Sequence, residues 1–215
     1  MNKNLFEIEN LFYNTTNSKR LSKLCFQYEI FKKIKKVKGS IIDYGVLNGS
    51  SLFRFAIFSQ IENCNKMIYG FDVFKKPEIF KKDPSKKKFN KWYKTLSYQL
   101  TYKQLLSNIK KRKFTKIKLI KGYAETTIPK FFEKKIKISL INLDFDLYYP
   151  SKIALEKSWP MLSKNGIIIF DNYKIFDGET KAVDEFLKRN KLLKKLKKIK
   201  IFILQQIFLN LVVIL

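Results

Sequence analysis

Histidine is absent from the 215-residue sequence, and only two cysteines are present. A catalytic relay built on histidine and a zinc site held by histidine are therefore both excluded. Cys25 and Cys64 stand apart, without the spacing of a metal or redox motif. We therefore expect two reduced thiols in a cytoplasmic protein. Any metal ion would have to be held by oxygen atoms.

We expect neither a signal peptide nor a membrane-spanning segment. Residues 1–7 are polar, and no apolar stretch reaches the roughly 18 residues that a bilayer requires. No linker or internal repeat divides the chain, so we expect a single domain over residues 1–215. Its parts would be an N-terminal helical arm at 1–38, a core at 39–190 and a tail at 191–215, basic and then apolar.

Arginine is scarce even though the formal net charge is +27. Only four of the 45 basic residues are arginines, and the rest are lysines spread along the chain. A site built for phosphate would favour the planar fork of arginine. We therefore expect a solvated basic surface and no nucleic-acid partner, with a non-enzymatic nucleic-acid binder kept as an alternative.

Short apolar runs alternate with segments of helical periodicity through the core, which predicts an α/β fold: a doubly wound, mostly parallel sheet in a three-layer α/β/α arrangement. The lysine-rich segment Lys75–Lys91 contains two prolines and is predicted to be a mobile, exposed loop. The strand-like runs are Ser40–Tyr44, Met67–Phe71, Lys116–Lys121, Ile138–Leu143 and Gly166–Phe170. The helical segments are Leu21–Val37, a helix starting near Leu52, Trp92–Ile109, Ser151–Leu162 and Thr180–Leu187.

Both ends of the chain leave alternatives open. Residues 1–20 have the spacing of a short amphipathic helix, which would serve as a lid or as a dimer arm in a homo-oligomer. The tail can form a hairpin at the sheet edge, with strands at Lys200–Leu204 and Phe208–Leu215. Its alternative is a basic amphipathic helix followed by an anchor that contacts a membrane surface weakly.

The stretch Ile138–Tyr173 carries the most informative polar residues. Its pattern is strand, helix, strand, and each strand runs into polar side chains. In a right-handed parallel unit these side chains meet at one edge of the sheet, where ligands bind. Such a cluster suits a divalent cation or a general base, and loop capping without catalysis is the alternative. The residues concerned are Asp144, Asp146, Asp171 and Asn172.

A glycine turn follows the first strand. The pattern from Asp43 through Gly45 and Gly49 to Ser50 would bring backbone N–H groups close to a ligand, with Asp43 able to neutralise a cationic group. An ordinary tight turn with a serine cap explains the same pattern. Asp72 ends the second strand 23 residues after Gly49, near the distance at which nucleotide-binding folds place an acid for ribose hydroxyls.

Six segments, in order, resemble the macrocin O-methyltransferase family, class I methyltransferases that use S-adenosylmethionine. The resemblance spans about residues 20–190 and implies a Rossmann-like fold. It further implies methylation of a hydroxyl on a small-molecule acceptor, a deoxysugar of an antibiotic or of a surface glycan. The six segments are Asp43–Ser51, Tyr69–Phe74, Lys121–Pro129, Leu143–Tyr148, Gly166–Tyr173 and Gly178–Leu187.

The resemblance also implies roles for individual residues. In the family a magnesium ion lies in the site, and a carboxylate is the proposed general base. Carried over residue by residue, the metal ligands become Asp144, Asp171 and Asn172, and the base becomes Asp146. The cofactor contacts become Asp43, Gly45, Gly49 and Ser50 for the methionine end, Asp72 for the ribose, and Glu125 for the adenine side.

The sequence departs from the family pattern in two places. The acidic pair that is usually Asp-Asp reads Asp171-Asn172 here, so magnesium should bind more weakly. The apolar ending of the tail does not resemble the usual close of the family. A cofactor-binding relative that performs another reaction, such as hydroxylation, is therefore the second alternative.

Overall fold

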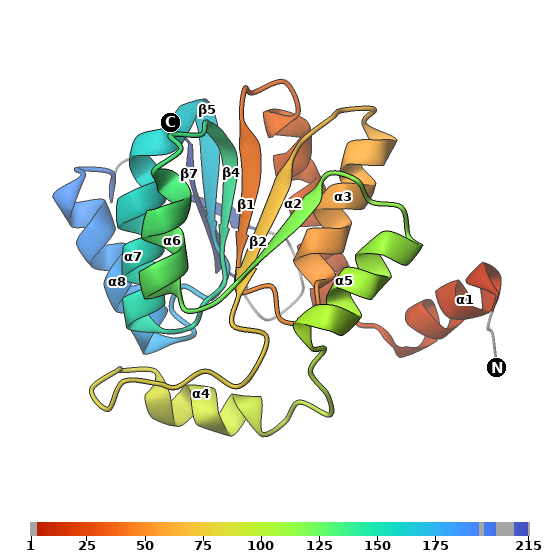
Figure 1. The fold of residues 1–215 in the computed structure, drawn as a ribbon, viewed down its shortest axis with the longest axis horizontal. Helices are drawn as coiled ribbons and strands as arrows, with labels where there is room; N and C mark the ends of the chain where they lie inside the picture. Colours follow the sequence, from red (N-terminus) through yellow and green to blue (C-terminus); the bar gives the residue numbers. More distant parts are fainter. Residues whose placement is uncertain (1–3, 194–195, 201–208, 215) are drawn as a thin grey trace.

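The protein is described by a computed structural model at residues 4–193, 196–200 and 209–214. A seven-stranded sheet in the order β3-β2-β1-β4-β5-β7-β6 forms the middle layer, and helices cover both of its faces (Figure 1). The strands are β1 (Ser40–Tyr44), β2 (Ile68–Asp72), β3 (Ile117–Lys121), β4 (Ile138–Leu143), β5 (Leu162–Phe170), β6 (Leu196–Lys200) and β7 (Leu209–Ile214).

The sheet is parallel from β3 to β5, and only the tail strands run against that direction. β1 pairs in parallel with both β2 and β4, β2 with β3, and β4 with β5. β7 is antiparallel to β5, and β6 is antiparallel to β7. The predicted doubly wound, mostly parallel sheet in three layers is therefore confirmed.

Two groups of helices cover the two faces of the sheet. One face is covered by α2 (Ser18–Ile34), α3 (Ser50–Ile61) and α5 (Tyr102–Lys111). The other is covered by α6 (Ala124–Phe132), α7 (Tyr148–Ser158) and α8 (Asp177–Arg189), and the short 3₁₀ turn η1 (Trp159–Met161) follows α7. α4 (Lys86–Tyr93) lies beyond the carboxyl ends of the strands, and α1 (Leu5–Thr15) extends away from the sheet (Figure 1).

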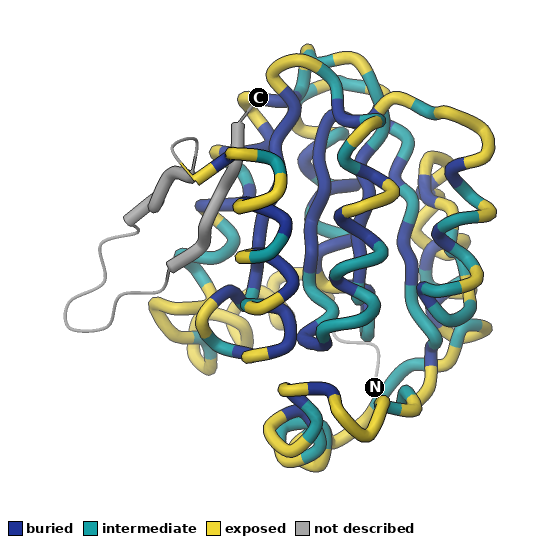
Figure 2. Tube along the Cα trace, turned by 90° about the vertical axis from the view of Figure 1, so that its left-hand side faces the viewer, coloured by how far each residue is buried: buried dark blue, intermediate teal, exposed yellow. Residues whose placement is uncertain are grey.

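The sheet separates two hydrophobic cores because successive strand residues point to opposite faces. In β4, Ile141 and Leu143 pack on the side of α6, α7 and α8, whereas Leu140 packs on the side of α2 and α3. All six residues of β4 are buried, as a central parallel strand covered on both faces requires. Figure 2 shows this continuous buried layer between the more exposed helices.

The ends of the chain differ from each other. None of the 11 residues of α1 is buried, whereas α2, which the sequence places in the N-terminal arm, packs Ile30 and Phe31 into the core. In the tail, β7 lies beside β5 and β6 forms the edge. The predicted strand at Lys200–Leu204 falls outside the described residues except for Lys200, which ends β6. Among the described residues, no helix is both long and apolar enough to cross a membrane.

Two helical regions differ from the prediction. The prediction of one helix over Trp92–Ile109 was wrong, because α4 ends at Tyr93 and α5 begins at Tyr102. Thr101 starts α5 with a capping box: its hydroxyl accepts the N–H of Gln104, whose side chain bonds back to the Thr101 N–H. α6 was not predicted at all; it carries Pro129 at its sixth position, a residue that disfavours helix interiors.

The prediction of an exposed loop at Lys75–Lys91 was also wrong in its second half. Asp83, Ser85 and Phe89 are buried. The Asp83 carboxylate accepts the N–H of Tyr148 at 2.9 Å, and the Ser85 hydroxyl accepts the N–H of Gly178 at 2.7 Å. These two side chains therefore cap the first turns of α7 and α8, which have no cap hydrogen bond from their own N-cap residues.

Hydrophobic contacts reinforce the stretch at residues 80–93, which we call the capping segment. Phe89 packs in a small cluster with Leu147, which precedes α7, and with Phe176, which precedes α8. A Cβ on Gly178 would lie 2.7 Å from the Ser85 hydroxyl and 2.8 Å from an Asp83 oxygen, so the approach is close. α4 is thereby fixed across the carboxyl edge of the sheet.

A buried polar group also lies at the centre of the sheet. The Asp43 carboxylate, at the end of β1, accepts the hydroxyl of Ser51 at 2.8 Å and the amide of Asn142 at 2.7 Å. It thus joins β1 to α3 and to β4. Burial raises the pKa of the Asp43 carboxyl from its ordinary 3.8 to about 6, even though both hydrogen bonds lower it.

Replacing Asp83 by Ala should loosen α4. The change removes one cap from α7, which should cost about 1 kcal/mol of stability, in the range of lost N-caps. Amide hydrogen exchange of residues 86–93 should accelerate, and the unfolding midpoint in urea should fall. Lys82→Ala, at the exposed neighbouring position, is the matched control. Unchanged exchange in α4 would contradict the capping role.

Replacing Asp43 by Asn should flatten the pH dependence of stability. A raised carboxyl pKa means that the folded state holds the proton more tightly, so this stabilisation is present below pH 3.8 and is lost as the pH rises through about 6. The whole effect is about 3 kcal/mol. Urea unfolding of wild type and variant across this window measures it.

The exposed Asp177, replaced by Asn, serves as the control for a change of one charge. The Asp43→Asn variant should gain stability relative to wild type as the pH rises, because it has no carboxyl to ionise. Parallel stability curves for the variant and wild type would show that Asp43 does not carry this pH dependence.

Candidate active site

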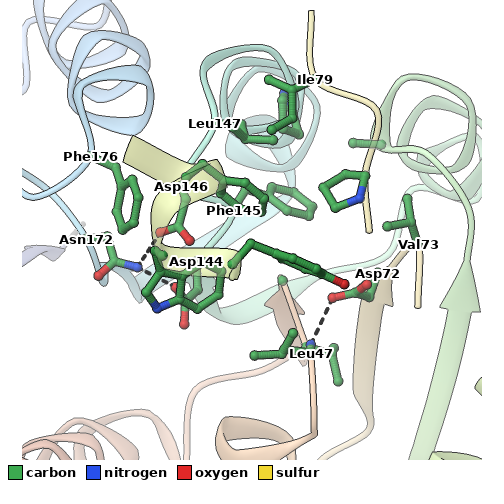
Figure 3. A pocket seen from close by; sticks show the side chains of 18 of the residues that line it. Leu47, Asp72, Val73, Ile79, Asp144, Phe145, Asp146, Leu147, Asn172 and Phe176 are labelled. Carbon is green, nitrogen blue, oxygen red and sulfur yellow. Dashed lines mark hydrogen bonds between the residues drawn. The ribbon is translucent and has the colours of Figure 1, made fainter. Parts of the chain in front are cut away.

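A cavity of about 950 Å³ opens at the carboxyl ends of the parallel strands. Its size is in the range of sites for small molecules and cofactors. It is bounded by the turns after β1, β2 and β3, by the loops after β4 and β5, and by the capping segment (Figure 3). Among the residues predicted for the site, those that line it are Gly45, Ser50, Asp72, Glu125, Asp144, Asp146, Asp171 and Asn172.

The turn after β1 depends on a glycine. Gly45 has φ +79°, and a Cβ there would lie 1.9 Å from the carbonyl oxygen of Asp144. Only glycine therefore lets the turn after β1 pass the loop after β4. Gly49, at φ +85°, is the N-cap of α3; a Cβ there would meet Phe53 and Leu105, and Gly49 is not among the described residues that line the cavity.

Asp72 joins two of the turns that bound the cavity. One of its oxygens accepts the N–H of Leu47 at 2.8 Å, and the other accepts the N–H of Phe74 at 2.6 Å. Burial raises the pKa of its carboxyl, while these backbone donors lower it. A carboxylate has about four lone-pair sites, so Asp72 can still accept a hydrogen bond from a hydroxyl of a ligand.

The other two predicted cofactor residues differ in position. Glu125 lies in the first turn of α6 and lines the cavity. Asp43 is fully buried behind the turn, hydrogen-bonded to Ser51 and Asn142, and is not among the described residues that line the cavity. The predicted contact between Asp43 and a ligand therefore stays a prediction. The hydrogen-bond partners of Asp43 in the structure are side chains of the protein.

The polar side chains after β4 and β5 meet, as their strand positions predicted. The amide of Asn172 donates to an oxygen of Asp144 and to an oxygen of Asp146, both at 2.6 Å (Figure 3). Lys23 connects Asp171 to this cluster. Its ammonium nitrogen is 2.5 Å from the Asp171 carboxylate and 4.0 Å from that of Asp144.

Glu179 of α8 connects the loop after β4 to the loop after β5. Its carboxylate is fully buried and accepts the N–H of Asp146 at 3.0 Å and the N–H of Asn172 at 3.1 Å. Asp146 has φ +64°, a left-handed conformation that costs about 1–2 kcal/mol in a non-glycine residue. Strain of this kind persists where surrounding contacts enforce it, and it is concentrated at functional sites.

Burial, together with the crowding of carboxyl groups, raises the pKa values of the acids in the cluster. Burial, followed by the charge of Asp171, raises the pKa of Asp144 well above its ordinary value. Burial, followed by the charge of Glu179, raises the pKa of Asp146 in the same way. A carboxylate whose pKa is raised is a stronger base than an ordinary surface aspartate.

Two cations face this acidic cluster. Burial lowers the pKa of Lys23, but the nearby Asp171 and Asp144 carboxylates outweigh it, so the net shift is upward. Arg54 of α3 also lines the cavity, and burial lowers the pKa of its guanidinium. The Nε atom of Arg54 is buried without a hydrogen-bond partner among the described residues.

Sequence reasoning missed Lys23, Arg54 and Glu179 as site residues. Arg54 offered a signal, because it is one of only four arginines and follows the glycine turn by one helical turn. Glu179 lies in a segment that carries the family resemblance. Lys23 offered none, since nothing distinguishes it from the many other lysines of the chain.

The residues predicted to hold magnesium do not present a suitable set of ligands. Magnesium needs oxygen ligands in near-octahedral geometry. Here Asn172 turns its amide donor toward Asp144 and Asp146, and the Lys23 ammonium ion lies on Asp171. No group of three or more cysteine or acidic side chains in the described part of the chain is arranged to hold a metal ion. The magnesium prediction is therefore not supported.

Comparison with solved structures identifies related folds. CalS11, a TDP-rhamnose 3′-O-methyltransferase of calicheamicin biosynthesis, superposes with a TM-score of 0.70 at 22% identity, covering 100% of this chain and 87% of its own. The O-methyltransferase NovP gives 0.75 at 16% identity, covering 90% and 79%. PaMTH1 of Podospora anserina, bound to S-adenosylhomocysteine, gives 0.53 at 16% identity, covering 89% and 76%.

Comparison of sequences gives the family. No curated protein sequence matches the chain. The family model for macrocin O-methyltransferase (TylF) matches residues 8–204, a longer stretch than the 20–190 over which the motifs resemble the family. The chain therefore belongs to the macrocin O-methyltransferase family and is an S-adenosylmethionine-dependent O-methyltransferase with a Rossmann-like fold.

Proposed function

We propose that the chain transfers the methyl group of S-adenosylmethionine to a hydroxyl of a deoxysugar or of a glycosylated small molecule, with Asp146 as the general base. The observation that carries the proposal is the position of Asp146. Asp146 lines the cavity, its carboxylate accepts the amide of Asn172, and its backbone N–H donates to the carboxylate of Glu179. A base needs this fixed placement within hydrogen-bond reach of the hydroxyl.

The reaction balances without a further reactant. The hydroxyl oxygen attacks the methyl carbon of the sulfonium group, and a new C–O bond forms as the C–S bond breaks. The electron pair of the C–S bond stays on sulfur, which becomes the neutral thioether of S-adenosylhomocysteine. The hydroxyl proton passes to the Asp146 carboxylate and then to solvent.

The turns after β1, β2 and β3 supply the cofactor side of the cavity in this proposal. Gly45 and Ser50 lie where the methionine end would approach the backbone, Asp72 would accept a ribose hydroxyl, and Glu125 would lie on the adenine side. Asp43 and Gly49 support the same turn from behind, through Ser51 and the start of α3.

The acceptor side carries many aromatic side chains. The capping segment contributes Phe80, Trp92 and Tyr93, and the loops after β4 and β5 contribute Phe145 and Phe176. Flat apolar surfaces suit the apolar faces of a sugar that lacks a hydroxyl, while polar groups fix its orientation. CalS11 acts on such a nucleotide-linked deoxysugar, which supports this class of acceptor.

Calorimetry with S-adenosylhomocysteine tests the cofactor assignment. Wild type should bind, and Asp72→Ala should weaken binding by about tenfold or more, because it removes a charged hydrogen-bond acceptor and frees the turn at Leu47. Glu133→Ala, at an exposed acid beyond α6, should bind as wild type does. No binding by wild type at about 1 mM ligand would overturn the proposal.

Replacing Asp146 by Asn tests the base. Methyl transfer should fall by about 100-fold or more, the usual contribution of a positioned base. Affinity for S-adenosylhomocysteine should stay within about twofold, since the amide oxygen can still accept the Asn172 hydrogen bond. Mass spectrometry after incubation with labelled cofactor and a panel of nucleotide-linked deoxysugars measures the product.

The result also separates the alternatives. An unchanged rate in Asp146→Asn would assign proton transfer to another group. Cofactor binding by wild type without methylation of any sugar in the panel would favour a relative with a different acceptor or a different reaction, such as hydroxylation.

A further inference from the structure

We infer that Lys23 and Asn172 together take the place of a divalent cation, so that the active site works without a bound metal. The role of Lys23 in the reaction rests on the proposed function, whereas the absence of a metal site from the residues that the structure describes does not. Its central observation is that the positions predicted to hold magnesium are already bridged by donors of the protein.

Asn172 bridges the two carboxylates after β4. Its single amide group donates to both Asp144 and Asp146 at 2.6 Å. An aspartate at this position would bring a third carboxylate against these two and would need a cation between them. The amide removes one negative charge and supplies two donors, so it satisfies both carboxylates without an ion.

Lys23 supplies the positive charge for the remaining carboxylate. Its side chain comes from α2 and is 24% exposed, whereas the Asp171 side chain that it contacts is 5% exposed. The pair is therefore largely withdrawn from water, where an ion pair is screened less than at the surface. A divalent cation at Asp171 would have to displace this ammonium ion, with which it would clash electrostatically.

The ammonium group can also serve the reaction directly. It carries three N–H donors, one of which goes to Asp171. The others are available to the hydroxyl oxygen of an acceptor in the same cavity, which Lys23 lines with Asp146. A cationic donor at the nucleophilic oxygen would favour loss of its proton to Asp146, the effect expected of a metal ion.

Metal binding is the first test, and it does not depend on finding the acceptor. Mn²⁺ is titrated into the protein by calorimetry, and free Mn²⁺ is measured by electron paramagnetic resonance. Wild type and the surface control Lys157→Met should bind no Mn²⁺ at the site at about 1 mM metal. The double variant Lys23→Met/Asn172→Asp should bind Mn²⁺ with a Kd of about 0.1 mM or lower, because the carboxylates of Asp144 and Asp171 and the one introduced at position 172 are then free to coordinate.

Wild type binding Mn²⁺ as tightly as the double variant would overturn the inference. Circular dichroism and S-adenosylhomocysteine binding establish that each variant is folded, so loss of structure cannot imitate a result. Asn172→Asp alone should bind more weakly than the double variant, since Lys23 still competes for Asp171. Equal affinities of these two variants would remove Lys23 from the inference.

Activity is the second test, applied with an acceptor from the sugar panel. The wild-type rate should be unchanged after EDTA treatment and after added Mg²⁺. Lys23→Met should lower kcat by about tenfold or more, and Lys23→Arg should restore part of it, because the arginine keeps the charge and donors. Loss of wild-type activity in EDTA with recovery in Mg²⁺ would overturn the inference.

The two proposals can fail separately. Failure to methylate any sugar of the panel counts only against the proposed function. The Mn²⁺ titration still decides whether Lys23 and Asn172 take the place of a metal ion.

Discussion

The buried negative charge at the carboxyl edge of the sheet is the constraint on which the rest of the site depends. Asp144, Asp146, Asp171 and Glu179 converge there, and burial penalises the charged form of such groups. The protein meets this cost with internal partners: Lys23 on Asp171, the Asn172 amide between two carboxylates, and two backbone donors on Glu179. The raised pKa of the Asp146 carboxyl is a direct consequence of this burial and of the neighbouring charge of Glu179.

Contacts between distant segments hold that charge in position. Glu179 of α8 ties the loop after β4 to the loop after β5, while Asp83 and Ser85 cap α7 and α8 from a segment some sixty to ninety residues earlier in sequence. The same capping segment brings aromatic side chains to the cavity. The acceptor side is thus built from a segment whose own stability depends on the helices that it caps.

Much of the fold could be predicted from the sequence, and the failures have physical causes. The central strand β4, most of β1 and the second half of β5 are buried, so their apolar runs are continuous and stand out. Polar residues directly after β4 and β5 had to meet at one edge of the sheet. The capping segment was missed because Asp83 and Ser85 lie among lysines, and local composition gave no sign of burial. α6 was missed because Pro129 interrupts the usual helical signal. Lys23 reaches the site only through the packing of α2, which no local pattern encodes.

The separation of charge by sign explains why the net charge of +27 says little about function. Of the residues that the structure describes, the buried acids are Asp43, Asp83, Asp146, Asp171 and Glu179, whereas the one buried basic residue is Lys66. The lysines therefore lie mostly in solvent, where they contribute little to a specific site. The five buried acids lie at or behind the turns and loops around the cavity, where charges are screened less by water and interact more strongly. The chemistry of the site therefore depends on a few buried acids. Lys23, which pairs with one of them, supplies the positive charge that a metal ion would otherwise provide.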